Sequence, residues 1–147
     1  INQRVLVNIT SQLYILKIFE PYLDFKSSVC LFSSIYGHRS PDHRIYDDNF
    51  IKPIEYTASK ASILGITKHF AVTSAFQKKG RCNCIVLGGL ENNLQSVSFK
   101  ENYIKKVPLG RMANIKDVIN AYKFISSEES SYITGSSIFV DGGYSCW

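Results

Sequence analysis

Hydrophobic and polar positions along this chain alternate between a helical period and short apolar runs. Residues 3–23 place apolar side chains three or four positions apart, which predicts an amphipathic helix. The apolar runs "SSVCLFSS" at 27–34 and "RCNCIVLGG" at 81–89 have the length of buried strands. Between them, residues 55–79 return to the helical pattern, and Gly80 is a typical stop signal.

The C-terminal third continues the same alternation. Residues 90–107 predict a loop with a short helix around 99–105, and "SSIFVDGG" at 136–143 predicts a last strand. Residues 114–129 predict a helix capped by Asn114. Its buried side is expected to carry Val118, Ile119, Tyr122, Phe124 and Ile125.

The order helix, strand, helix, strand, helix, strand is typical of a parallel α/β layered fold. In such sheets ligands bind beyond the carboxyl ends of the strands. The three predicted strands end at Ser33–Ser34, at 87–89 and at 141–143. We expect the first two ends and the start of the 55–79 helix to meet in one crevice. The polar segment 36–53 predicts a long loop beside it, and such loops in compact domains are usually functional or disordered.

Composition and charge narrow the class of protein. The 147 residues make one domain at most, and 45% hydrophobic with 20% charged residues is globular. No run reaches the roughly 18 uncharged apolar residues of a membrane span, so neither an anchor nor a membrane partner is predicted. The net charge of +5 comes from scattered cations, and their longest cluster, "KKGR" at 78–81, suits a solvated helix end. A nucleic-acid partner is therefore not predicted.

The cysteines and histidines form no metal-binding pattern. Cys30, Cys82, Cys84 and Cys146 include no CxxC pair, and no Cys/His spacing suits zinc. Cys82 and Cys84 stand at strand spacing among apolar residues, which favours buried free thiols. Free thiols favour a reducing, cytoplasmic location.

The helix at 55–79 carries the most suggestive chemistry. Tyr56 and Lys60 are four residues apart, so their side chains share a helix face. The small residues Ala58, Ser59 and Ala61 leave room for a ligand to approach. Taken alone, the pair is better explained as a surface Tyr–Lys pair on an amphipathic helix.

Four elements in a fixed order resemble the short-chain dehydrogenase/reductase family. The segment "YTASKAS" is similar to the catalytic signature of that family, and "LFSSIYG" resembles the strand end that supplies its catalytic serine, at Ser34. The helix "VLVNITSQLYILKIFEPYL" is similar to the one that carries its catalytic asparagine, at Asn8. "RCNCIVLGGLENN" resembles the strand and turn under the nicotinamide, and "VPLGRM" with "YITGSSIFVDGG" resembles the C-terminal part.

The resemblance implies a role for each of these residues. Tyr56 is the general acid/base, and the nearby Lys60 ammonium favours its phenolate and holds the ribose hydroxyls of NAD or NADP. Ser34 donates a hydrogen bond to the substrate oxygen, where charge develops. Asn8 holds a water that leads protons from Lys60 to solvent. Alone, Ser34 is also compatible with a strand end and Asn8 with a buried polar residue.

The chain departs from the family pattern at its beginning. It contains no Gly-rich phosphate-binding turn after a first strand. The resemblance therefore implies a partial Rossmann-like fold, a doubly wound parallel sheet whose N-terminal nucleotide-binding half is absent. We expect residues 1–147 to be the C-terminal portion of one such domain, a fragment that lacks roughly 100 residues. The choice between NAD and NADP stays open, because the deciding residue lies in the absent half.

A second departure lies under the expected nicotinamide site. The family usually has Pro-Gly after this strand, whereas this chain has Leu87–Gly88–Gly89. Gly88 and Gly89 still allow the backbone to approach a cofactor closely, and we expect both to contribute to cofactor binding.

The third departure is the spacing between the expected serine and tyrosine. Ser34 and Tyr56 are 22 positions apart, which is wider than the common family spacing. The lengthened loop, with "IYDDN" and "KPIEY", resembles a branch associated with bacterial flagellin or surface-polysaccharide sugar modification. An activated or acidic sugar would then be the substrate. Its carboxylate or phosphate is expected at Arg39, His43, Arg44 and Arg111, unless the loop is simply solvated.

The predicted function is an NAD(P)-dependent oxidoreductase that interconverts an alcohol and a carbonyl, with a homodimer or homotetramer as the assembly. One alternative is a sugar epimerase or dehydratase that uses the same Tyr–Lys pair. Another is a non-catalytic half-domain that acts only in assembly, since family members commonly pair through the helices that match residues 3–22 and 55–79.

Overall fold

The structure is a computed structural model that describes residues 2–47 and 50–147. The first helical rod contains α1 (Asn2–Val5), a π-helical turn at Leu6–Thr10, α2 (Ser11–Phe19) and a 3-10 turn at Glu20–Tyr22. Two strand–helix units follow, β1 (Ser28–Ser34) with α3 (Ile54–Phe76), and β2 (Arg81–Leu87) with α4 (Val97–Ile104) and α5 (Ile115–Ser126). The strand β3 (Ser137–Val140) lies near the C-terminus.

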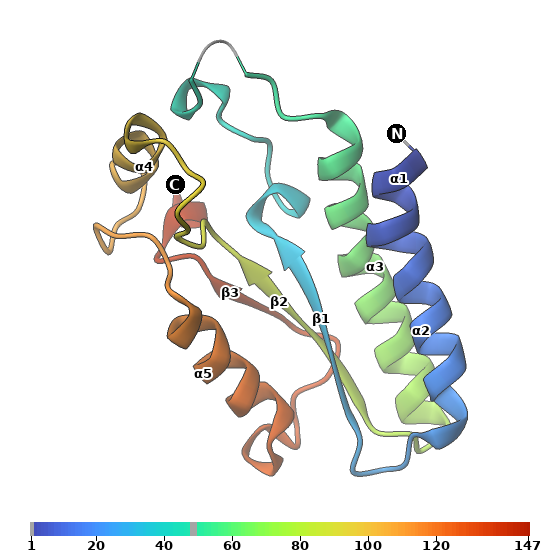
Figure 1. Ribbon diagram of the computed structural model, residues 1–147. Coiled ribbons are helices and arrows are strands. Elements are labelled where there is room, and N and C mark those ends of the chain that lie inside the picture. The colour runs from blue at the N-terminus through green and yellow to red at the C-terminus, as the bar shows by residue number, and fades with distance from the viewer. Residues whose placement is uncertain (1, 48–49) are drawn as a thin grey trace.

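The strands form a parallel sheet in the order β1-β2-β3 (Figure 1). Ser28–Ser34 of β1 pairs in register with Arg81–Leu87 of β2, whose last four residues pair with β3. All three carboxyl ends therefore point the same way, toward the loop that precedes α3. The predicted α/β class with a parallel sheet is confirmed.

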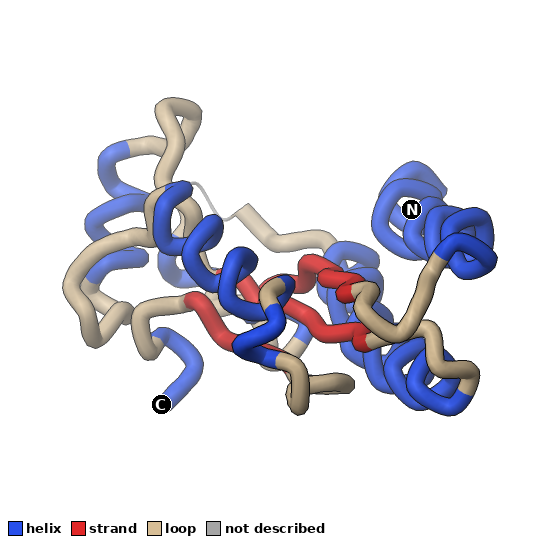
Figure 2. The backbone as a smooth tube through the Cα atoms, turned by 90° about the horizontal axis from the view of Figure 1, so that it is seen from below, coloured by secondary structure: helices blue, strands red, loops and turns tan. Residues whose placement is uncertain are grey.

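Helices cover both faces of this sheet (Figure 2). Successive residues of a strand point to opposite faces, and two serines of β1 show this directly. Ser33 Oγ donates to the Lys60 carbonyl of α3 at 2.7 Å, whereas Ser28 Oγ donates to the Ile125 carbonyl of α5 at 3.1 Å. The helix α3 thus lies on one face and α5 on the other.

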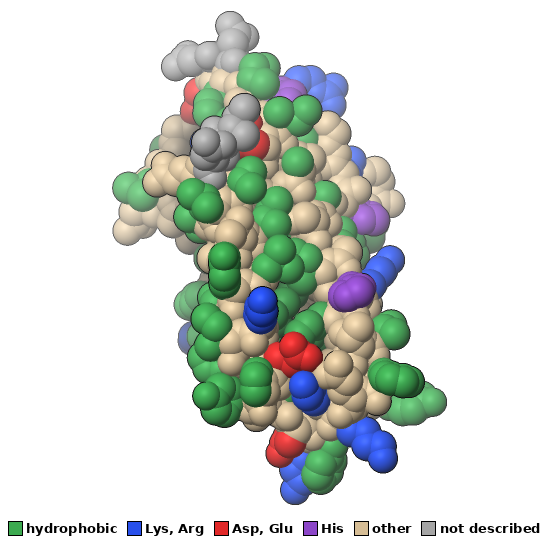
Figure 3. Space-filling model, turned by 90° about the vertical axis from the view of Figure 1, so that its right-hand side faces the viewer, with side chains coloured by type: hydrophobic (Ala, Val, Ile, Leu, Met, Phe, Trp, Pro, Cys, Tyr) green, Lys and Arg blue, Asp and Glu red, His purple; other side chains and the backbone are tan. Residues whose placement is uncertain are grey.

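The rod α1–α2 packs beside α3, and the outer surface of this helix pair exposes many hydrophobic side chains among charged and histidine side chains (Figure 3). Figure 3 views that side of the molecule, where hydrophobic side chains gather along the length of the surface. Val7, Tyr14 and Ile18 of the rod and Val72 and Phe76 of α3 are all exposed. Within this rod, Leu16 of α2 is buried and points into the core.

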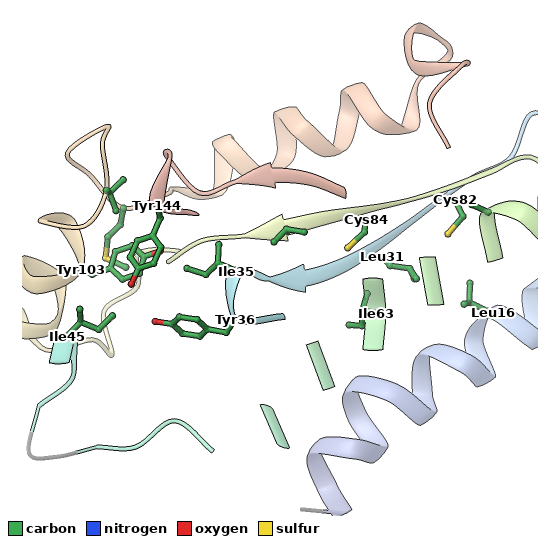
Figure 4. Close-up of a cluster of buried hydrophobic side chains, with 14 residues drawn as sticks. Leu16, Leu31, Ile35, Tyr36, Ile45, Ile63, Cys82, Cys84, Tyr103 and Tyr144 are labelled. Carbon is green, nitrogen blue, oxygen red and sulfur yellow. The ribbon is translucent and has the colours of Figure 1, made fainter. Parts of the chain in front are cut away.

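The core lies mainly between the sheet and α3 (Figure 4). Leu31 of β1, Cys82 and Cys84 of β2 and Ile63 of α3 are buried there, and the cysteines are free thiols. This confirms the prediction for Cys82 and Cys84. At the carboxyl ends of the strands the core continues as an aromatic group, in which the rings of Tyr103 and Tyr144 stack at 4.9 Å.

Two sequence predictions for the helices need correction. The burial expected on one side of α5 is confirmed for Val118 and Ile125 and is wrong for Ile119, Tyr122 and Phe124, which are 41%, 46% and 44% exposed. Tyr122 stacks on Phe32 of β1, which is itself 39% exposed, so the edge of the sheet leaves this side of α5 open. Phe124 is two positions further along and therefore lies on the other side of the helix. The helix α3 ends at Phe76 rather than 79, because Lys78 adopts a positive φ of 57°.

The predicted loop 36–53 contains two short 3-10 turns, Ile35–Gly37 at its start and His43–Ile45 within it. Ile45 is buried at 1% exposure, so the middle of the loop is anchored to the core. Residues 48 and 49, part of the predicted "IYDDN" motif, lie outside the described residues.

Candidate active site

The start of α3 sets the position of Tyr56. Pro53 has an extended backbone and precedes the helix, and its carbonyl accepts the Tyr56 N–H at 3.0 Å. Proline cannot continue a helix toward its N-terminus without losing a donor, so α3 starts here. Glu55 is held by Arg4 of α1 at 2.7 Å, which ties the rod to the first turn of α3.

Ser34 is the last residue of β1. It is 8% exposed, and its Oγ accepts the Tyr36 N–H at 3.2 Å as the cap of the following 3-10 turn. This turn lies tightly against α3, since a Cβ at Gly37 would come within 2.6 Å of the Lys60 carbonyl. Gly37 therefore allows the end of β1 to approach the helix turn that carries Lys60.

Lys60 lies one turn after Tyr56, and its ammonium has N–H groups that are available for a ligand. Its Nζ donates to the Phe32 carbonyl of β1 at 3.4 Å, and burial lowers the pKa of the ammonium. No carboxylate of residues 2–47 and 50–147 forms an ion pair with it. An ammonium has three N–H donors, so two stay available for a ligand. This arrangement fits the ribose hydroxyls of a nicotinamide cofactor.

Asn8 contacts α3 at Ser59, between Tyr56 and Lys60. It lies in the π-helical turn, a feature that often occurs at functional sites. Its Nδ2 donates to Ser59 Oγ at 3.1 Å, and that hydroxyl donates to the Tyr56 carbonyl at 2.8 Å. Asn8 therefore contacts the turn of α3 between Tyr56 and Lys60, and Ser34 ends β1, the strand whose Phe32 carbonyl accepts a hydrogen bond from the Lys60 ammonium.

Gly88 and Gly89 follow β2, as predicted, and make close contacts with the protein itself. A Cβ at Gly89 would come within 2.6 Å of the Tyr103 ring, and one at Gly88 within 2.8 Å of the Asp141 Cα. The Gly89 N–H also donates to the Tyr103 hydroxyl. Packing of α4 and of the turn after β3 against the end of β2 therefore accounts for both glycines. Their cofactor-binding role stays a prediction.

The third strand end is a turn. The Asp141 carboxylate accepts the N–H groups of Gly143 at 3.0 Å and Ser145 at 2.9 Å, and Gly142 and Gly143 have positive φ. Asp141 therefore organises the turn.

The four side chains expected to bind an acidic substrate are engaged elsewhere. Arg39 donates to the carbonyls of Tyr144 and Trp147 at 2.8 and 2.7 Å, and His43 Nδ1 accepts the Lys52 N–H. The other two guanidinium groups pair with carboxylates, Arg44 with Asp42 and Arg111 with Asp117.

The structure places another cation in the crevice. Lys52 Nζ lies 4.7 Å from the centre of the Tyr56 ring. The segment "KPIEY" is part of the lengthened loop, but a lysine four residues before a tyrosine and outside the helix carries no periodic signal.

The described part of the chain contains no helix with the length and apolar character needed to cross a membrane.

Comparisons with known proteins place this geometry in a family. A family profile described as enoyl-(acyl carrier protein) reductase matches residues 1–145. An uncharacterised short-chain dehydrogenase/reductase of Sinorhizobium fredii is 30% identical over 146 residues, covering 95% of this chain and 54% of the relative. A 3-oxoacyl-[acyl-carrier-protein] reductase of Chlamydia pneumoniae is 37% identical over 91 residues, covering 60% of this chain and 36% of the relative.

Comparison with solved structures indicates the same family. A short-chain dehydrogenase from Leptospira borgpetersenii with bound NAD+ superimposes with a TM-score of 0.84 and 36% identity, over 97% of this chain and 55% of that one. The chain spans about half the length of the Sinorhizobium fredii relative and of this solved structure, and about a third of the Chlamydia pneumoniae relative. The match extends along almost the whole chain, and on that basis this chain belongs to the short-chain dehydrogenase/reductase family.

Proposed function

We propose that the protein is a nicotinamide-dependent oxidoreductase that interconverts an alcohol and a carbonyl group. One observation carries this proposal. Lys60 of α3 donates to the Phe32 carbonyl of β1, the strand that ends at Ser34, and Asn8 donates to Ser59, which lies between Tyr56 and Lys60. The bound NAD+ in the relative from Leptospira borgpetersenii supports the choice of cofactor.

The side chains divide the work between them. Tyr56 gives a proton to the substrate oxygen in reduction and takes it back in oxidation. Ser34 donates its hydroxyl hydrogen to the same oxygen and stabilises the charge that develops there. Lys60 keeps a positive charge near the Tyr56 oxygen, which favours the phenolate, and offers its remaining N–H groups to ribose hydroxyls. Bound nicotinamide supplies or accepts the hydride.

Asn8 acts at a distance from the substrate. Its amide fixes Ser59, which in turn holds the backbone between Tyr56 and Lys60. We assign to it the support of a water-filled path from Lys60 to solvent, along which the proton of each turnover leaves. Gly88 and Gly89 provide the backbone beside the nicotinamide.

Substitutions of Tyr56 and Lys60 test the proposal in the protein expressed from its complete reading frame. Tyr56→Phe is expected to lower kcat by about 100-fold or more, because it removes the proton donor, while NADH affinity stays nearly unchanged. Lys60→Ala is expected to lower both kcat and the affinity for NADH. Turnover is followed by nicotinamide absorbance on a panel of secondary alcohols and sugars, and NADH binding by calorimetry.

Tyr132→Phe is the matched control, since Tyr132 is fully exposed on the turn before β3. It should behave like the unmodified protein in both measurements. If Tyr56→Phe keeps most of the activity, Tyr56 is not the acid/base. If the unmodified protein binds no NAD(P)H, the chain serves in assembly only.

We also propose that copies of the chain associate through the outer surface of α2 and α3 into a homodimer or homotetramer. The exposed apolar side chains on this surface support it (Figure 3).

A further inference from the structure

Lys52 is a cation without a carboxylate partner in the part of the chain that the structure describes. It lies in the loop just before α3, and its backbone N–H donates to His43 Nδ1 at 3.3 Å. His43 belongs to the 3-10 turn His43–Ile45, which is anchored in the core by the buried Ile45. This backbone hydrogen bond helps to fix the position of Lys52 beside Tyr56.

Three tyrosine rings surround the Lys52 ammonium. Its Nζ lies 4.7 Å from the centre of Tyr56, 5.6 Å from Tyr46 and 6.0 Å from Tyr36, all within the range of a cation–π contact. Tyr46 and Tyr36 share a hydroxyl hydrogen bond of 3.0 Å, and burial raises the pKa of both. They therefore stay neutral and give the ammonium no counter-charge.

Arg4 adds a second positive charge that acts on Lys52. Burial lowers the pKa of Lys52, and repulsion by Arg4 lowers it further. Glu55, next to Tyr56 in the chain, is held by Arg4 at 2.7 Å. A half-buried ammonium that forms no ion pair within residues 2–47 and 50–147 has lost part of its hydration, and an anionic group would recover that cost.

A cleft of about 460 Å³ gives access to Lys52. It lies between the loop before α3 and the residues before and within α4, and Lys52 is the one cation among the described residues that line it. The cleft also contains the Asp47 carboxylate, which accepts hydrogen bonds from the hydroxyls of Ser96 and Ser98. Tyr46 and Phe99 form an apolar wall, with their rings stacked at 5.2 Å.

We propose that Lys52 is a specificity-determining residue that binds an anionic group, a carboxylate or a phosphate, on the substrate. The inference rests on the proposed function, because Tyr56 marks the position of the reacting oxygen. The 4.7 Å between Nζ and the Tyr56 ring places the anionic group a few bonds from the reacting carbon. The substrate class is then an alcohol or carbonyl compound that carries such a group close to the reacting centre.

A lysine titration tests this without any need for turnover. The protein from the complete reading frame, with its lysines isotopically labelled at Cε, gives a nuclear magnetic resonance signal for each lysine. The Lys52 signal is identified by its loss in both Lys52→Gln and Lys52→Arg, so a misfolded variant cannot mislead the assignment. Malonate and inorganic phosphate are titrated at constant ionic strength, with chloride as the balancing ion.

The Lys52 signal is expected to shift and saturate at an anion concentration about tenfold lower than that of Lys116, an exposed lysine of α5. Saturation by malonate alone indicates a carboxylate, and saturation by phosphate alone a phosphate. If Lys52 responds no more strongly than Lys116 to either anion, the inference is wrong. A lack of nicotinamide turnover would instead count against the proposed function, since the titration does not depend on it.

Discussion

Ionisation of the buried Cys82 thiol is expected to make the stability of the protein depend on pH. Its residue is fully buried on β2, and burial, with smaller contributions from Cys30 and Cys84, raises the pKa of the thiol to about 12. In the unfolded chain the same thiol ionises near pH 9, so from about pH 9 to 12 the unfolded state binds fewer protons. The free energy of unfolding therefore falls as pH rises through this window, by up to about 1.4 kcal/mol per pH unit.

Cys82→Ala is expected to make this alkaline decline less steep, although the cavity it leaves lowers stability at neutral pH by about 1 kcal/mol. Urea unfolding at a series of pH values measures both effects. Cys146→Ala is the control, because Cys146 is exposed and should leave the curve unchanged. An equally steep decline in Cys82→Ala would show that Cys82 does not set the alkaline limit.

Individual residues also show why the site was only partly predictable. Tyr56 and Lys60 are neighbours on one helix face, so their spacing in the sequence is already their spacing in space. The position of Lys52 could not be predicted in this way. Its ammonium lies near the rings of Tyr36, Tyr46 and Tyr56 only because the chain folds back on itself. The four side chains that were expected to bind an acidic substrate instead contact backbone groups or carboxylates of the protein itself. The pattern of charges in the sequence does not reveal these contacts.

At the scale of elements, α5 begins with a complete capping box. Asn114 Oδ1 accepts the N–H groups of Lys116 at 2.9 Å and Asp117 at 3.2 Å, and the Asp117 carboxylate accepts the Asn114 N–H at 2.8 Å. Asn114→Ala is expected to lower the free energy of unfolding by about 1 kcal/mol, because it leaves first-turn donors without an acceptor.

Chemical denaturation measures that change, and Asn114→Asp tests its cause. Aspartate keeps an acceptor at the cap and adds a charge that suits the helix N-terminus, so it should retain most of the stability. A loss as large as that of alanine would mean that the cap hydrogen bonds are not what stabilises α5.

Element positions could be predicted because caps, glycines and apolar periods are local signals, and strands and helices appear within a few residues of their expected bounds. The π-helical turn at Leu6–Thr10 carries no such signal, since it depends on the contact of Asn8 with α3. The apolar side of α5 was also misread in part. Periodicity shows that Ile119 and Tyr122 share a helix side, but the width of the sheet decides whether that side is covered.

At the scale of the whole molecule, the outer surface of the helix pair has the properties of a self-association site. Tyr14 and Ile18 are one turn apart on α2, Val72 and Phe76 are one turn apart on α3, and all four are exposed. At Gly65 of α3, an added Cβ would meet nothing within 4 Å, so a second helix has room to approach there. An isologous contact would place this surface of one copy against the same surface of another.

Val72→Asp is therefore expected to weaken self-association by about tenfold or more, because it puts a charge into the apolar contact. Val97→Asp is a closely matched control, since Val97 on α4 is 73% exposed and Val72 is 71% exposed. Both substitutions replace an exposed helical valine, so neither should unfold the single copy, and only Val72 lies on the proposed surface. Sedimentation velocity over a range of protein concentrations measures the difference. A protein that is monomeric throughout, or equal association of the two variants, would contradict pairing through this surface.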